Sequence, residues 1–156
     1  MTVKIERATL KDLSDIQHLN NKLFELELAN FDQNLISNWP LSKEGKAYFS
    51  DMIENHFVLI AKDDNRTVGY FAGTIGVKEF YTKGLLAEMD NMFVEEKERG
   101  QGVGKMFLDA FKNECVKQNI SAIRVSASAK NKNAIAFYEK TGFEVHNITL
   151  NQKLNQ

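Results

Sequence analysis

The sequence has little of several residues on which a structural argument often rests. Cys115 is the only cysteine among the 156 residues, so no disulfide can form within the chain, and Pro40 is the only proline. No apolar run is long enough to span a bilayer, and the first residues lack the apolar core of a signal peptide. Lys and Arg number 20 against 21 Asp and Glu, far from the basic surface of a nucleic-acid binder. We therefore expect a cytoplasmic protein with no nucleic-acid and no membrane partner.

Metal ligation and thiol catalysis are not expected either. His18, His56 and His146 are scattered along the chain without the spacing of metal ligands, so we predict no metal. Cys115 follows the apolar positions of a helical pattern, which favours a buried packing role over an acyl-carrying nucleophile.

The residues that are present predict one mixed α/β domain over residues 1–156. Apolar residues make up 43% and charged residues 26%, as in globular proteins. Alternating and helical periodicities give the order β-α-α-β-β-β-α-β-α-β. The strands are expected at 3–8, 56–61, 67–75, 85–94, 122–128 and 143–150, and the helices after the capping box 9–12 and at 42–55, 102–118 and 134–140.

A glycine-rich run occupies positions 99–105, with the sequence Arg-Gly-Gln-Gly-Val-Gly-Lys, between an expected strand and an expected helix. Glycines let main-chain N–H groups approach a ligand, and a helix start adds unpaired amides that favour phosphate. A Walker loop is excluded, because Arg99 stands at its first glycine position and Met106 follows Lys105. A dinucleotide fingerprint is excluded because the glycines alternate. A ligand-free turn and a phosphate site remain as alternatives.

A second segment makes the glycine run more specific. The pattern Arg99-x-x-Gly102-x-Gly104 resembles the pyrophosphate-binding motif of the GNAT superfamily of acyl-CoA N-acyltransferases. The segment 131–143, with Asn131, Tyr138 and Gly-Phe at its end, resembles that superfamily's second signature. The resemblance implies an α+β fold with a central, mostly antiparallel mixed sheet of six to seven strands and about four helices.

The same resemblance implies how an acyl-CoA would be bound. The strand before the glycine run carries a bulge in the family, and the pantetheine arm pairs with its main chain. The Met92 N–H would polarise the thioester carbonyl, and Asn131 would hydrogen-bond to the arm or to nearby backbone. The implied cofactor-binding residues are Met92, Phe93, Val94, Arg99, Gly100, Gln101, Gly102, Val103, Gly104, Lys105, Asn131 and Tyr138.

The resemblance also suggests the proton-transfer groups. Tyr138, placed near the start of the last helix, is the expected acid for the departing thiolate. Glu88 is the expected base, and Asp90, on the same sheet face by alternation, is the second choice. Glu25, Glu27, Asp32 and Trp39 either line the acceptor mouth or form a solvated helix face.

These expectations combine into an N-acetyltransferase. It would transfer the acetyl group of acetyl-CoA to a primary amine, of a small molecule or a peptide, by direct attack in a ternary complex. The alternative is a non-catalytic domain of the same fold that binds acyl-CoA as a sensor or interaction module. Because members of the superfamily often dimerise, the resemblance also admits a homodimer.

Overall fold

The computed structural model describes residues 2–155, which divide into two compact units after Ser126. The first unit holds all of the strands and three of the four α-helices that the described residues form. Its elements are β1 (Val3–Arg7), α1 (Leu13–Asn30), α2 (Lys43–Asn55), β2 (Phe57–Asp63), β3 (Arg66–Val77), β4 (Leu86–Val94), α3 (Val103–Lys117) and β5 (Ala122–Val125). The second unit, from Ala127 onward, contains α4 (Lys132–Lys140).

Local sequence signals set the starts of the first two helices. The Thr9 N–H donates to Asp12 Oδ2 at 2.8 Å, and the short 3-10 turn so formed leads directly into α1. Ser42 Oγ accepts the Gly45 N–H at 3.1 Å and thereby caps α2. Both helix starts agree with the sequence prediction.

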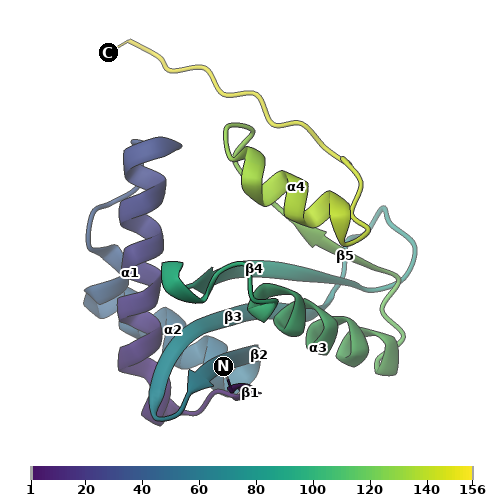
Figure 1. The fold of residues 1–156 in the computed structure, drawn as a ribbon. Coiled ribbons are helices and arrows are strands. Elements are labelled where there is room, and N and C mark those ends of the chain that lie inside the picture. Colours follow the sequence, from purple (N-terminus) through teal and green to yellow (C-terminus); the bar gives the residue numbers. More distant parts are fainter. Residues whose placement is uncertain (1, 156) are drawn as a thin grey trace. The chain divides into compact units, whose positions relative to one another are not determined.

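The five strands of the first unit form one sheet in the order β1-β2-β3-β4-β5 (Figure 1). The first four strands are antiparallel neighbours, and β2 and β3 are joined by the predicted hairpin. The last pair, β4 with β5, is parallel and only four residues long. The mixed, mostly antiparallel sheet is thus confirmed, but with five strands in place of the six to seven expected.

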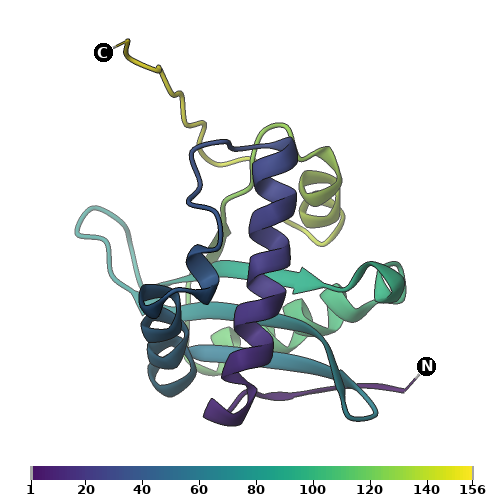
Figure 2. The ribbon, with the colours of Figure 1, turned by 90° about the vertical axis from the view of Figure 1, so that its left-hand side faces the viewer.

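Helices cover both faces of this sheet. In Figures 1 and 2, α1 and α2 lie on one face and α3 on the other. The core under α1 and α2 contains Ile16, Leu19, Phe49, Met52, Ile53, Val58, Ile60, Tyr70, Ala72 and Phe93. Under α3, rings of Phe57, Phe71, Phe107 and Phe111 pack against one another. None of the helices within residues 2–155 is both long and apolar enough to cross a membrane.

A β-bulge at Asp90 interrupts the pairing of β3 with β4. Met89 lies opposite Gly73 and Asn91 opposite Ala72, so Asp90 is an extra residue without a partner on β3. The pairing of β4 with β5 also ends at Met89. From the bulge onward β4 therefore keeps a strand neighbour on one side only within the first unit.

The second unit contradicts one prediction. Its helix α4 ends as expected: Gly142 has φ +100°, its N–H donates to the Glu139 carbonyl, and the Phe143 N–H donates to the Tyr138 carbonyl. Residues 143–150, however, form no strand, although their sequence alternates. The apolar side chains Val145, Ile148 and Leu150 are exposed, so no burial secures the register that alternation alone suggested.

The close approach of Gly45 to the turn before α2 gives a stability prediction. A Cβ at position 45 would lie 2.4 Å from the Trp39 carbonyl oxygen and 2.6 Å from that of Pro40. Alanine normally stabilises a helix by about 1 kcal/mol relative to glycine. We expect Gly45→Ala to lower the free energy of unfolding instead, by about 1–3 kcal/mol, because backbone atoms must move. Urea denaturation measures this, with the exposed Glu54→Ala in the same helix as control.

Candidate functional site

The glycine run forms the turn that starts α3. Gly100 and Gly102 have φ values of +75° and +86°, which favour glycine, and a Cβ at either would meet no atom within 4 Å. Gly102 is the N-cap of α3, and the first helical hydrogen bond runs from the Met106 N–H to the Gly102 carbonyl at 2.9 Å. The amides of residues 103–105 therefore point out of the helix start toward open space, which suits an anion.

Arg99 fixes this turn to β4. Its Nε donates to the Val94 carbonyl at 2.8 Å, and its guanidinium carbon lies 5.2 Å from the centre of the Phe93 ring. At the other end of the run, Lys105 pairs with Asp109 at 2.6 Å on the exposed surface. Arg99 thus has a structural role in addition to its positive charge.

The edge of β4 beyond the bulge presents free main-chain groups within the first unit. The Glu95 N–H donates to the Val68 carbonyl at 2.8 Å, so by alternation the N–H groups of Phe93 and Glu95 face β3. Those of Met92 and Val94 face the opposite way, where β5 no longer pairs. The carbonyl of Val94 on this edge accepts from Arg99, and the Met92 N–H, the Met92 carbonyl and the Val94 N–H remain.

A cleft of about 310 Å³ opens on the α1 and α2 face of the same strand. It lies wholly within the first unit. Its lining residues are Asn20, Leu23, Phe24, Glu27, Asp32, Leu35, Trp39, Tyr48, Phe49, Asp90 and Asn91. Three of these are acids and none is basic, so the cleft favours a cationic ligand.

Aromatic rings form a continuous wall in this cleft. Phe24 and Trp39 stack with their centroids 5.8 Å apart and their planes 14° apart. Trp39 meets Tyr48 at 5.7 Å, and Tyr48 meets Phe49 edge-on at 4.9 Å. Such a wall can contact the apolar part of a ligand or the face of a cation.

The bulge places Asp90 in the cleft. Thr74 Oγ1 donates to Asp90 Oδ2 at 2.8 Å. Asp90 remains exposed to solvent on one side, and its partial burial raises its pKa, which the Thr74 hydrogen bond and the charge of His56 oppose only in part. Glu88 lies opposite Thr74 on β3 and opposite Arg124 on β5, and it is not part of the cleft lining.

Two further acids, Glu27 and Asp32, also line the cleft. Burial raises the pKa of Glu27, and the nearby Asp32 carboxylate adds to the rise. Asp32 Oδ1 accepts from the Asn34 N–H at 2.9 Å and from Asn34 Nδ2 at 3.1 Å. No described Lys, Arg or His forms an ion pair with either acid.

The structure separates the sequence-predicted acceptor residues into two groups. Asp32, Trp39 and Asp90 line the cleft together, as does Glu27. Glu25 does not: it is exposed and accepts from Asn21 Nδ2 at 3.3 Å, because it lies on a different face of α1.

The cleft also contains residues that the sequence reasoning missed. Asn20 and Phe24 precede the predicted Glu27 by seven and three positions on α1, so helical spacing from Glu27 could have found both. No sequence pattern indicated that Asn91 would line the cleft, because its position there depends on the bulge in β4. Asn91 Nδ2 reaches Tyr48 Oη at 3.5 Å.

The second signature lies in the second unit. Asn131 Oδ1 accepts the Ala134 N–H at 3.1 Å and so caps α4. Tyr138 lies in the last turn of α4, not near its start as expected, and its ring contacts those of Phe137 and Phe143 at 5.4 and 5.6 Å.

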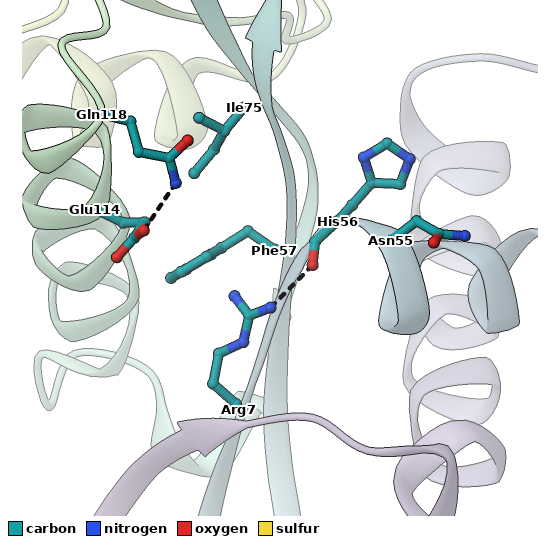
Figure 3. Close-up of a pocket in the computed structure, with 7 residues that line it drawn as sticks. All are labelled: Arg7, Asn55, His56, Phe57, Ile75, Glu114 and Gln118. Atoms are coloured by element: carbon teal, nitrogen blue, oxygen red, sulfur yellow. Dashed lines mark hydrogen bonds between the residues drawn. The ribbon is translucent and has the colours of Figure 1, made fainter.

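A different cavity, of about 370 Å³, lies near the C-terminal end of α3 (Figure 3). Arg7 Nη2 donates to the His56 carbonyl at 3.0 Å and its guanidinium covers the Phe57 ring at 4.3 Å, while the His56 ring turns away toward Asn55. Gln118 Nε2 donates to Glu114 Oε1 at 2.8 Å in the same cavity, so the side chains of Arg7, Glu114 and Gln118 are already engaged in hydrogen bonds. The cavity also lies at the opposite end of α3 from the glycine run, so we do not assign it to the same site.

Neither a metal centre nor a reactive thiol is found among the described residues. No group of three His, Cys, Asp or Glu side chains there could hold a metal ion. Cys115 is 3% exposed in α3, and burial, followed by the nearby Glu114 carboxylate, raises the pKa of its thiol to about 11.

Comparison with known proteins identifies related folds and a family. Residues 18–143 match the sequence profile described as the acetyltransferase (GNAT) family. This range covers most of the chain, including the glycine run, the cleft and α4.

Solved structures agree with this match. A mutant protein from Bacillus halodurans superposes with a TM-score of 0.83 at 19% identity, covering 99% of this chain and 100% of that one. A protein described as a predicted acetyltransferase from Clostridium acetobutylicum, with acetyl-CoA, has a TM-score of 0.78 at 25% identity, covering 97% and 96%. The aminoglycoside acetyltransferase AAC(6')-Iy, in complex with a bisubstrate analogue of CoA, has a TM-score of 0.76 at 15% identity, covering 99% and 100%.

The burial of Cys115 gives a prediction about thiol reactivity. At pH 8 the thiol is protonated in the folded protein, because its pKa lies near 11. We expect a disulfide exchange reagent to label the folded protein about 100-fold more slowly than the urea-unfolded protein. Absorbance of the released thiolate measures both rates. Equal rates would show that the thiol is accessible.

Proposed function

Because the chain belongs to the GNAT acetyltransferase family, we propose that it transfers the acetyl group of acetyl-CoA to a primary amine in a ternary complex. The observation that carries the proposal is the position of the β4 bulge. It lies between a free main-chain edge, which can bind an extended donor, and an acidic cleft, which can bind an amine. A direct transfer needs both substrates at one point, and β4 contributes to both surfaces.

The residues of the first unit fit coenzyme A. The amides at the start of α3 would hold the pyrophosphate, and the glycines at 100 and 102 leave the space above them open. The Met92 and Val94 N–H groups would pair with the amides of the pantetheine arm, as an added strand does. When bound, acetyl-CoA supplies the acyl group as a reactive thioester. The Met92 N–H is our candidate for polarising its carbonyl.

Asp90 is a better candidate than Glu88 for the base that removes a proton from the acceptor amine. An attacking amine must lose a proton, and a carboxylate whose pKa is raised is a stronger base than an ordinary one. Asp90 meets both conditions, because it lines the cleft and burial raises its pKa. We therefore assign proton removal to Asp90, directly or through a water. Tyr138, by its place in the second signature, is our candidate to protonate the departing sulfur.

Substitution in the glycine run tests donor binding. Gly102→Asp would place a carboxylate where the pyrophosphate is expected, and we expect CoA affinity to fall about 100-fold or more, because like charges repel. Gly76→Asp is the matched control: Gly76 has the same φ of +86° and equally open surroundings, but lies on β3. Isothermal titration with CoA measures both. An equal loss in the two variants would attribute the effect to backbone strain.

A turnover assay tests the reaction and the base. We follow release of the CoA thiol from acetyl-CoA over a panel of primary amines. Asp90→Asn should lower kcat about 100-fold or more, whereas Glu88→Gln should change it little. Because the pKa of Asp90 is raised, wild-type kcat should increase as pH rises through that pKa. This increase should be absent from the pH profile of Asp90→Asn. CoA binding without turnover of any amine would instead indicate the sensor module.

A further inference from the structure

We propose that the acceptor is a small compound with two or more ammonium groups, whose reacting amine lies beside Asp90 while a second ammonium binds between Glu27 and Asp32. This inference rests on the proposed acetyl transfer and specifies its substrate. A monoamine would use one end of the cleft only.

The charge of the cleft supports this assignment. Glu27, Asp32 and Asp90 all line it, and no lining residue is basic. No described Lys, Arg or His forms a salt bridge with any of the three, and the charge of His56 acts on Asp90 only without such a contact. By contrast, Glu95 and Glu98 nearby in the first unit are paired with Lys22 and Arg66. The cleft therefore leaves its negative charge for a ligand to neutralise.

The pair Glu27 and Asp32 is costly in the absence of a cation. Both carboxylates are half-buried, and the pKa of Glu27 is raised by burial first and by Asp32 second. A cation between them would offset both contributions by its attraction and favour the ionised form of Glu27. A neutral hydroxyl or an anionic group at the same place would not.

The geometry of α1 separates the two charged ends of the cleft. Asn20, Phe24 and Glu27 lie along one face of the helix, and seven residues of helix rise span about 10 Å. The helix crosses the sheet and its C-terminal half continues past β4 (Figure 2). Glu27 therefore lies about two helical turns beyond Asn20 along this face, and a ligand that spans the face must itself be extended.

Unpartnered acceptors mark the inner end of the cleft. Asn20 is 2% exposed and donates through Nδ2 to Tyr70 Oη at 2.6 Å, but its buried Oδ1 has no hydrogen-bond partner. Asn91 Oδ1 is likewise buried and unpartnered. Unsatisfied buried oxygens are costly, and an amine with several N–H donors is a ligand that can satisfy them.

The middle of the cleft suits the hydrocarbon between the two amines. Leu23, Leu35 and the stacked rings of Phe24 and Trp39 line it. A cavity of about 310 Å³ matches a small molecule. Protein and peptide amines are therefore not the substrate we propose.

Two acceptors of equal chain length, one with a second amine and one without, test whether the cleft binds a second ammonium group. We compare 1,5-diaminopentane with 1-aminopentane as acceptors and expect kcat/KM for the diamine to be about 10-fold higher or more. Glu27→Gln and Asp32→Asn should each raise KM for the diamine about 10-fold, and the change in KM for the monoamine should be much smaller. Glu25→Gln, two residues away on α1 and outside the cleft, is the control and should change neither. Thermal unfolding verifies that each variant is folded.

Two further acceptors in the same assay show whether the preferred substrate is a linear polyamine or a compound with its ammonium groups on sugar rings. Spermidine is a linear polyamine, and neamine carries its ammonium groups on sugar rings. A higher kcat/KM for either one, lost in Glu27→Gln, supports the proposal and identifies the source. Preferred turnover of a peptide amine would overturn it.

Two outcomes separate this inference from the proposed function. Equal kcat/KM for the diamine and the monoamine, or equal effects of Glu27→Gln and Glu25→Gln, would overturn the dication assignment while acetyl transfer stands. Absence of transfer to every amine would overturn the proposed function. In that case, titration of 1,5-diaminopentane into the CoA-bound protein decides the site alone, since its binding should weaken in Glu27→Gln and not in Glu25→Gln.

Discussion

One extra residue in β4 is the constraint on which the rest of the site depends. Without the bulge at Asp90, regular alternation would turn Asp90 and Asn91 to opposite faces of the sheet. With it, both lie in the cleft, and Met92 returns to the opposite face, across from Phe71. The same point is where the parallel ladder with β5 stops. A single insertion thus creates the side-chain surface and the free main-chain edge together.

The cleft wall is held by backbone as well as by side chains. The turn that carries Trp39 rests directly on Gly45, where a methyl group would collide with carbonyl oxygens. Trp39 also stacks on Phe24 of α1 and touches Tyr48 of α2. The wall is therefore positioned by both helices. A preorganised cleft loses less conformational entropy when a flexible ligand binds.

Sequence reasoning succeeded where the determining signal is local. Ser42 capping α2, the hairpin of β2 and β3, the left-handed Gly142 after α4 and the glycine turn at 99–105 each depend on a few neighbouring residues. The family also followed from two short motifs. The strand at 143–150 failed because alternation does not supply a pairing partner. The bulge could be anticipated only by resemblance, since no residue type requires it, and Asn91 was missed with it.

The free edge of β4 has a consequence for how such proteins diverge. A donor bound through the N–H groups of Met92 and Val94 contacts atoms that every residue except proline possesses. Selection for donor binding then acts on the path of the backbone and leaves the side chains free to vary. The proposed acceptor cleft is the opposite case, because Glu27, Asp32 and Trp39 would act through their side chains.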